Sequence, residues 1–245
     1  MNALEIHGLT KQRGDFVLRG LELTLPAGCI MGLIGENGAG KSTTIRLILN
    51  GLRRDGGTIA VYGKDNRAMT ALDREDIGVV LDEVGLPEYM NAQQIGRMMA
   101  GIFTHWQPEA YRDYLRRLAL PEDKPFKDFS RGMRMRLGLA AALSHQPKLL
   151  LLDEATSGLD PVSRDELTEL LRRVVADGTR SVLFSTHITS DLEKCATHIA
   201  FIKDGELQYT GSLDDFRTHY KDVGATLEDI IVHVERRPLD EDAII

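Results

Sequence analysis

The chain has 245 residues, 42% of them hydrophobic, which is enough to bury the core of one large α/β domain and too apolar for a disordered protein. Its 30 basic and 37 acidic side chains give a formal net charge of −7, and this balance argues against nucleic acid as a partner, because nucleic-acid-binding surfaces carry a basic excess. No apolar run approaches the about 20 residues that cross a bilayer and no secretion signal is visible, so we expect neither a membrane-spanning nor a secreted chain.

The first third of the chain predicts strands around one helix. Apolar residues alternate with period two over residues 21–25, as in a half-buried strand. Residues 29–34 form a continuous apolar run, as in a strand buried on both faces. A glycine-rich segment follows, and residues 43–49 then predict a helix. Short strands are expected over residues 58–62 and 77–81.

The middle of the chain, residues 87–144, predicts helices. Apolar side chains recur at helical spacing between Ile95 and Phe103, and two further helices are expected over residues 110–120 and 131–143. Four large side chains form a stripe at helical spacing here. They can dock the helices of a partner at the surface or pack in the core, and the sequence leaves both alternatives open. They are Met90, Met98, Met99 and Trp106.

Strands return in the last third, at residues 148–152 and 181–185. The helix between them begins at Asp160, since Asp is a good N-cap and the next residue is proline, which is favoured at the first helical position. Residues 197–210 predict a hairpin with its turn at Asp204 and Gly205. A polar, loose end is expected from residue 238 onward.

This order of elements predicts an α/β fold. Strands and helices alternate, a helical segment intervenes, and the alternation resumes. Such a pattern is typical of a parallel-sheet core covered by helices, with an N-terminal antiparallel β subdomain and an inserted helical subdomain.

The two cysteines, Cys29 and Cys195, lie in apolar segments and form no Cys-x-x-Cys pair. We expect both to be buried, reduced thiols, with a disulfide or a metal role as the alternatives. Reduced thiols predict a cytoplasmic protein.

A phosphate-binding loop is the strongest functional signal, because residues 35–42 match Gly-x-x-x-x-Gly-Lys-Ser between an apolar strand and a helix. In such a P-loop the backbone N–H groups and the helix N-terminus bind phosphate oxygens, the lysine reaches the β- and γ-phosphates and the serine hydroxyl ligates Mg²⁺. A chance glycine-rich turn is the alternative. The expected ligands of the nucleotide are Gly35, Glu36, Asn37, Gly38, Ala39, Gly40, Lys41, Ser42 and Thr43.

Two carboxylates, Asp153 and Glu154, follow four leucines that predict a buried strand. The carboxyl end of such a strand lies beside the phosphate loop. There Asp153 would hold Mg²⁺, and Glu154 would orient or deprotonate an attacking water. The alternative is a strand end that meets solvent.

Together with the phosphate loop, these motifs resemble the nucleotide-binding domains of ATP-binding cassette (ABC) proteins. The resemblance covers residues 3–235, and the motifs stand in the order found in that family. They are residues 35–42, 129–133, 149–154, 157–160 and 185–187.

The resemblance implies roles for four further residues. Ser130 and Gly132 stand in the signature segment, which binds the γ-phosphate of ATP held by a second subunit; a plain helix N-cap is the alternative for Ser130. Asp160 matches a residue that crosses the dimer interface, and His187 matches the histidine that contacts the γ-phosphate and supports the attacking water.

The sequence departs from the family pattern at several positions. Arg13 occupies the place of the aromatic residue that stacks on adenine, with Phe16 nearby, and either can serve. Asp82 replaces the glutamine that ligates Mg²⁺ and touches the membrane partner, and a solvated acidic turn is its alternative.

Three further changes remove no group that the chemistry requires. They are Arg131 for glycine and Met133 for glutamine in the signature, and Ala155 for proline after Glu154.

The resemblance therefore implies an ATPase subunit of an ABC transporter, similar to stand-alone subunits of bacterial drug and antimicrobial-peptide exporters. Its cofactors would be ATP and Mg²⁺, and its partners a transmembrane permease and a second nucleotide-binding subunit at the cytoplasmic face of the membrane. A non-transporting ABC ATPase or an ATP-dependent regulatory module is the alternative. The expected parts are an ABC domain over residues 1–235 with its core in 1–82 and 146–220, a helical subdomain in 83–145, and an extension in 221–245.

Overall fold

An antiparallel sheet is built from the N-terminal part of the chain in the computed structural model, which describes residues 1–224 and 226–235. Its strand order is β2-β1-β4-β5. Along β2 the leucines Leu21, Leu23 and Leu25 are buried while the residues between them are exposed, as the period-two pattern predicts. The strands are β1 (Asn2–Arg13), β2 (Phe16–Pro26), β4 (Gly56–Val61) and β5 (Lys64–Asp65).

A second, six-stranded sheet forms the centre of the molecule, in the order β10-β9-β3-β8-β7-β6. All neighbouring pairs from β9 to β6 are parallel, and β10 pairs with β9 antiparallel. Every residue of β3, β7 and β8 is buried, which is why β3 and the first four residues of β7 are apolar without interruption, while β8 has a serine at each end. The strands are β3 (Ile30–Ile34), β6 (Ile77–Val80), β7 (Leu149–Asp153), β8 (Ser181–Ser185), β9 (His198–Lys203) and β10 (Glu206–Ser212).

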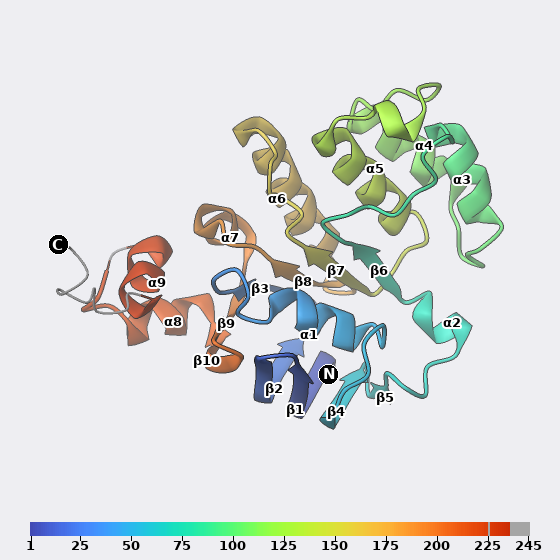
Figure 1. The fold of residues 1–245 in the computed structure, drawn as a ribbon. Helices are drawn as coiled ribbons and strands as arrows, with labels where there is room; N and C mark the ends of the chain where they lie inside the picture. Colours follow the sequence, from blue (N-terminus) through green and yellow to red (C-terminus); the bar gives the residue numbers. More distant parts are fainter. Residues whose placement is uncertain (225, 236–245) are drawn as a thin grey trace.

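Helix α1 (Lys41–Ile48) lies between the two sheets (Figure 1). Its buried side chains Ile45, Leu47 and Ile48 share one apolar core with β1, β2 and the near face of the six-stranded sheet. A second core covers the other face of that sheet and includes side chains of α6 (Pro161–Val175) and α7 (Thr189–Cys195). The α/β prediction with an antiparallel N-terminal sheet is confirmed.

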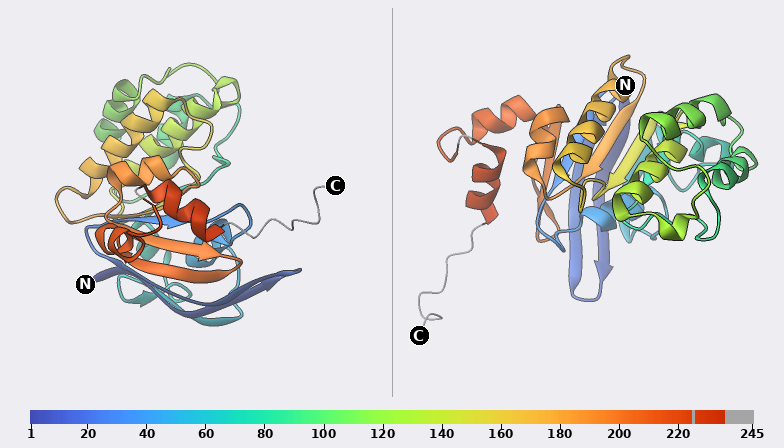
Figure 2. Two further views of the ribbon diagram at one scale, coloured as in Figure 1. Left: turned by 90° about the vertical axis from the view of Figure 1, so that its left-hand side faces the viewer. Right: turned by 90° about the horizontal axis from the view of Figure 1, so that it is seen from above.

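The helical subdomain has an apolar core of its own, which includes Trp106, Tyr111 and Phe126. It contains α3 (Ala92–Ala100), α4 (Pro108–Arg117), a 3₁₀ turn (Phe126–Asp128) and α5 (Arg131–Leu143). Met90 and Met99 pack against this core and Trp106 is buried, which supports the core reading of the methionine stripe. Figure 2 shows this subdomain and the C-terminal helices at opposite ends of the six-stranded sheet.

Several predicted boundaries were wrong. The first helix begins at Lys41 rather than at residue 43, and β2 begins at Phe16 rather than at residue 21. The strand β1 was not predicted, because register shifts between Ile6 and Lys11 interrupt its alternation. The helix α5 and the strand β8 have the predicted bounds.

The C-terminal part contains α8 (Leu213–His219) and α9 (Leu227–Glu235). The amine of Lys203 on β9 donates to the carbonyl of Val234, 2.7 Å away, and ties α9 to the sheet. The loose end predicted from residue 238 lies outside the described residues, as does part of the extension predicted over residues 221–245. The subdomain boundaries remain predictions.

Two further features concern the sequence predictions. Both cysteines are free; Cys195 is buried as predicted, whereas Cys29 is only half-buried, so the prediction of burial was wrong for Cys29. None of the helices in residues 1–224 and 226–235 combines the length and the apolar character needed to cross a membrane.

Candidate functional site

The phosphate loop joins the carboxyl end of β3 to the N-terminus of α1. Gly40 precedes the helix and offers no side-chain cap, so the first N–H groups of α1 remain available to an anion. The side chain of Lys41 is only 5% exposed, and its amine donates to the carbonyls of Gly35 (2.7 Å) and Glu36 (3.2 Å). The side chain of Lys41 therefore folds back over the loop, and its ammonium group lies against the loop backbone. Thr43 follows, half-buried, in the first turn of α1.

Gly35 allows the loop to pack directly on β9. Its φ is 152°, and a Cβ atom at this position would lie 2.1 Å from the carbonyl oxygen of Ile202. Gly205, in the β9–β10 turn, donates its N–H to the carbonyl of Ala39 at 3.1 Å. The β9–β10 hairpin thus packs against the phosphate loop and fixes its backbone.

Ser42 and Asp153 meet at the edge of the sheet. The Ser42 hydroxyl donates to Oδ1 of Asp153 at 3.0 Å, and the Ser185 hydroxyl donates to the same oxygen at 2.6 Å. Asp153 is buried at the carboxyl end of β7, directly opposite Ser185 on β8. The predicted juxtaposition of Asp153 and the phosphate loop is therefore present.

Glu154 lies between Lys41 and His187. Its Oε2 is 2.8 Å from Nδ1 of His187, and its Oε1 is 3.4 Å from Nζ of Lys41. Within residues 1–224 and 226–235, Oε1 is buried without a hydrogen-bond partner. The backbone N–H of Glu154 donates to the carbonyl of Ser185, and its φ of 52° places this residue in the left-handed region. A carboxylate oxygen that accepts no hydrogen bond and lies beside a cation is suited to hold a water molecule.

A cavity of about 420 Å³ opens beside the loop. Its lining includes Gly35, Glu36 and Asn37 of the loop, His187 after β8 and Ile231 of α9. The phosphate loop and His187 therefore face a common space.

The signature residues lie at the start of α5. Ser130 is its N-cap, and its hydroxyl accepts from the N–H of Met133 at 3.3 Å. A Cβ atom on Gly132 would lie 3.2 Å from Leu159, in the loop after Glu154. Across the described chain, no hydrogen bond or ion pair joins Ser130 or Gly132 to the phosphate loop. One chain therefore does not bring these two halves of the predicted site together.

Asp160 is the N-cap of α6. Its carboxylate accepts from the N–H groups of Val162 and Ser163, both at 3.1 Å, and from the Ser163 hydroxyl at 2.6 Å. The Ser163 hydroxyl bond is the main reason why the pKa of this carboxyl lies below its usual range. The capping role is present, and the role across a dimer interface stays a prediction.

Phe16, expected at adenine, lies against the phosphate loop, whereas no bond joins Arg13, or Asp82 in the place of the magnesium-binding glutamine, to that loop in the described residues. Phe16 is half-buried, and a Cβ atom on Gly40 would lie 2.9 Å from its ring, whereas Arg13 is exposed at the β1–β2 turn. Asp82 forms an ion pair with Arg131 at the start of α5, and no bond links it to Ser42 or Asp153 in the described residues. Adenine stacking and a magnesium role for Asp82 stay predictions.

Sequence reasoning assigned no role in the site to Ser185, Gly205 or Ile231, although Ser185 begins one of the motifs and Gly205 was expected in the hairpin turn. A polar residue directly after three apolar ones, and two positions before His187, was an available signal for Ser185. Gly205 and Ile231 come about 160 residues or more after the loop and reach it only through the tertiary fold. No local sequence pattern around either residue indicates this contact.

Comparison with known proteins agrees with this geometry. The sequence profile of the family described as ABC transporter matches residues 18–157. The chain is 36% identical over 224 residues to the daunorubicin/doxorubicin resistance ATP-binding protein DrrA of Streptomyces peucetius, covering 88% of this chain and 67% of that protein. It is 32% identical over 219 residues to the lantibiotic transport ATP-binding protein SrtF of Streptococcus pyogenes, covering 85% and 92%.

Solved structures have the same fold. An ATP-binding subunit of an ABC transporter superposes with a TM-score of 0.86 at 26% identity, covering 96% of this chain and 100% of that one. The dimeric ATP-binding cassette MJ0796, bound to ADP and Pi, gives a TM-score of 0.77 at 20% identity, covering 86% and 98%. The second likeness concerns the fold alone.

Proposed function

This chain belongs to the ABC transporter family as an ATP-binding and ATP-hydrolysing subunit, and we propose that it powers export of a drug-like molecule or a peptide through a separate transmembrane partner. The observation that carries the catalytic part is the arrangement of Glu154 between Lys41 and His187 beside the phosphate loop. The direction of transport and the class of solute rest on the names of the relatives.

Hydrolysis at this site needs a water held in line with the γ-phosphate. The N–H groups of the loop and Lys41 hold the phosphates, with the Lys41 amine exchanging its carbonyl partners for phosphate oxygens. Glu154 orients that water and accepts its proton, while His187 fixes the carboxylate from the other side.

A magnesium ion fits the donors beside the loop. The Ser42 hydroxyl and a carboxylate oxygen of Asp153, now bonded to each other, are ligand types that Mg²⁺ prefers. Waters and phosphate oxygens would supply the other ligands of such an ion. When bound, it neutralises charge on the β- and γ-phosphates.

A second subunit completes the site in this proposal. Ser130 and Gly132 open α5 with a hydroxyl, an N–H group and the positive end of a helix dipole. Because they do not reach the phosphate loop of their own chain, they would face the γ-phosphate on another copy or on a paralogue. The closed dimer would then hold two nucleotides between its halves.

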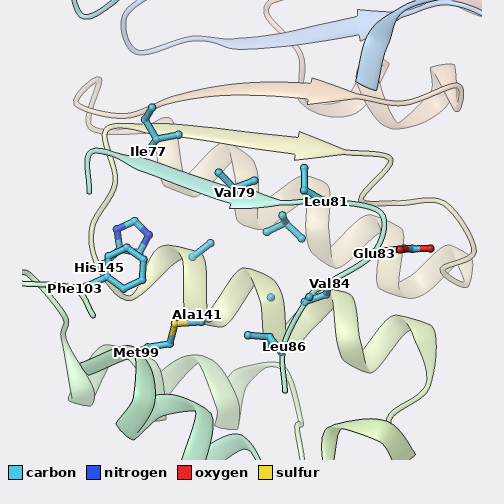
Figure 3. A pocket seen from close by; sticks show the side chains of 14 residues that line it. Ile77, Val79, Leu81, Glu83, Val84, Leu86, Met99, Phe103, Ala141 and His145 are labelled. Carbon is cyan, nitrogen blue, oxygen red and sulfur yellow. The ribbon is translucent and has the colours of Figure 1, made fainter. Parts of the chain in front are cut away.

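The transmembrane partner is proposed to dock beside β6, which would place the subunit at the cytoplasmic face of the membrane. A cavity of about 270 Å³ lies there between β6 and the helical subdomain. Figure 3 shows Ile77, Val79 and Leu81 on one side of it and Met99 and Ala141 on the other. An apolar recess of this kind suits the side chains of a short amphipathic segment.

Replacement of Glu154 by Gln tests the proposed chemistry. We expect ATP turnover to fall by at least about 10²-fold, because Gln cannot accept a proton, while ATP binding persists and a stable dimer accumulates on size-exclusion chromatography. Glu166→Gln, at an exposed glutamate of α6, is the matched control and should behave as the unmodified chain. Full turnover in Glu154→Gln would refute the assignment.

A further inference from the structure

We propose that Arg131 is a positioning residue for the nucleotide site formed between two subunits, and that it acts through its ion pair with Asp82. The inference rests on the proposed function, because it concerns how Ser130 is presented to a second subunit. Arg131 and Asp82 are two of the positions at which this sequence departs from the family pattern, and the structure brings these two departures into contact.

The ion pair joins the two parts of the subunit. Asp82 stands two residues after the end of β6, and Arg131 is the first residue of α5, 49 residues further along the chain. The guanidinium of Arg131 donates to Oδ1 of Asp82. The contact therefore links the edge of the central sheet to the helix that carries the signature residues.

A third segment lies against the same side chain. A Cβ atom on Gly158 would lie 3.2 Å from Cδ and 3.3 Å from Nε of Arg131. Gly158 belongs to the loop between Glu154 and α6, and Leu159 of that loop lies against Gly132. Arg131 thus contacts both the segment after β6 and the segment after β7.

The electrostatics of the helix end explain why the two residues belong together. A cation in the first turn of a helix is repelled by the positive end of the helix dipole. The negative charge of Asp82 offsets that repulsion, and the guanidinium of Arg131 holds the Asp82 carboxylate beside the start of α5. A change at either position leaves the other with an uncompensated charge beside Ser130.

Ser130 itself is fixed only weakly. Its hydroxyl accepts one bond, from the N–H of Met133 at 3.3 Å, at an exposed position. The direction in which it faces a second subunit therefore depends on how α5 leaves the core. On the side before Ser130, the guanidinium of Arg134 donates to the carbonyl of Phe129 at 3.1 Å and holds the segment to α5 itself. On the side after Ser130, the Arg131–Asp82 pair is the charged contact that joins the start of α5 to the segment after β6.

We expect only a modest loss of ATP turnover when the Arg131–Asp82 pair is removed. The two side chains are 52% and 51% exposed, and ion pairs of that exposure contribute little to overall stability. We therefore expect Arg131→Ala and Asp82→Ala each to lower the maximal ATP turnover by about twofold to fivefold, with little change in unfolding.

A double-mutant cycle tests the pair, with steady-state ATPase kinetics of the full chain as the readout. The double variant Arg131→Ala/Asp82→Ala should lose no more turnover than the more affected single variant, since the interaction can be removed only once. The charge exchange Arg131→Asp/Asp82→Arg should recover most of the turnover. Binding of a fluorescent ATP analogue to the monomeric chain should stay unchanged throughout, because the phosphate loop is intact.

The ion pair at the opposite end of β6 provides the control. Lys148 and Asp76 are 2.9 Å apart and similarly exposed, at 57% and 40%, but they lie at the amino end of the strand. Lys148→Ala and Asp76→Ala should leave turnover unchanged. The losses at Arg131 and Asp82 should also shrink as the salt concentration rises from about 0.05 M to about 0.5 M, because salt screens exposed charges.

Three outcomes would overturn the inference. They are single losses that multiply in the double variant, equal losses in the control pair, and a charge exchange as inactive as the worse single variant. The last would mean that Asp82 or Arg131 acts on Mg²⁺ or nucleotide directly. Failure of the proposed function is distinct, because the unmodified chain would then lack turnover or Glu154→Gln would not abolish it.

Discussion

Nδ1 of His187 lies 2.8 Å from Oε2 of Glu154, whose other carboxylate oxygen faces the amine of Lys41 at 3.4 Å. Glu154 and His187 follow the carboxyl ends of β7 and β8, and Lys41 begins α1 after the loop that follows β3. The three residues meet because these strands are parallel neighbours. Glu154 is held from both sides, and its orientation depends on both neighbours.

Loss of the His187 side chain should disable hydrolysis without unfolding the chain. We expect His187→Ala to lower ATP turnover by about 10²-fold, because Glu154 loses the group that orients it. His187 is 48% exposed, so the melting temperature should change little. Steady-state ATPase assays and thermal unfolding measure the two effects.

A matched histidine–glutamate pair lies far from the site. Nδ1 of His7 is 3.0 Å from Oε2 of Glu22, both 61% exposed. His7→Ala should retain full turnover. A similar loss in both variants, or none in His187→Ala, would contradict the role given to His187.

Two glycines with the same backbone angle separate steric clash from conformational preference. Gly205 and Gly63 both have a φ of 78°, but a Cβ atom would lie 1.9 Å from the carbonyl of Val17 at Gly205 and would meet nothing within 4 Å at Gly63. We expect Gly63→Ala to cost about 1 kcal/mol and Gly205→Ala about 3 kcal/mol or more, measured by urea unfolding. Equal costs would show that the hairpin turn can shift away from β2.

His145 should make stability depend on pH. It is 3% exposed, lies against the ring of Phe103 with centroids 4.1 Å apart, and its Nδ1 is 3.0 Å from the carbonyl of Glu75. Burial lowers the pKa of this histidine below its ordinary value of 6.5. The unfolded chain therefore binds a proton at a higher pH than the folded chain does, so acid favours unfolding.

The comparison with His145→Gln isolates this contribution. The free energy of unfolding of the unmodified chain, relative to that of the variant, should be constant above about pH 7 and should decrease as the pH falls below about 6.5, with a slope of at most about 1.4 kcal/mol per pH unit. Urea unfolding at a series of pH values measures it. A difference that does not vary with pH would mean that folding leaves the pKa of His145 unchanged, and a difference that grows as the pH falls would mean that folding raises it.

Adenine recognition should depend on Phe16 more than on Arg13. The ring of Phe16 lies against the phosphate loop, whereas Arg13 is exposed at the β1–β2 turn. We expect Phe16→Ala to weaken ATP binding by about tenfold, the size of one stacked base, while Arg13→Ala has a smaller effect. Calorimetry with ATP and with inorganic triphosphate distinguishes the base from the phosphates.

Phe16→Tyr keeps an aromatic ring and should keep the affinity for ATP. Triphosphate should bind all the variants equally. A larger loss of ATP affinity in Arg13→Ala than in Phe16→Ala would assign the stacking position to Arg13 instead.

Local sequence signals were sufficient for the parts of the fold and site that are contiguous in the chain. The loop from Gly35 to Ser42 and the strand that ends at Asp153 each have a distinctive composition, because a phosphate cradle needs glycines and a buried parallel strand is apolar throughout. The spacing of α5 and its capping serine were also visible, since Ser130 satisfies the helix end locally.

Contacts between distant segments were not predictable in the same way. The Asp82–Arg131 pair joins residues 49 positions apart, and nothing in either segment indicates the other. The start of β2 at Phe16 was missed because Arg19 and Gly20 interrupt its alternation, and it is held in the sheet by pairing with β1. Tertiary packing, rather than local preference, decides such elements.

The backbone at Glu154 carries a conformational cost at the residue for which we propose the catalytic role. A non-glycine residue with a φ of 52° holds about 1–3 kcal/mol of strain, and here the side chain also has a buried oxygen without a hydrogen-bond partner among the described residues. Glycine at this position would relieve both at once. On the role proposed for Glu154, the substitution that most relaxes the backbone here is therefore also one that ends ATP turnover, so stability and activity oppose each other at this position.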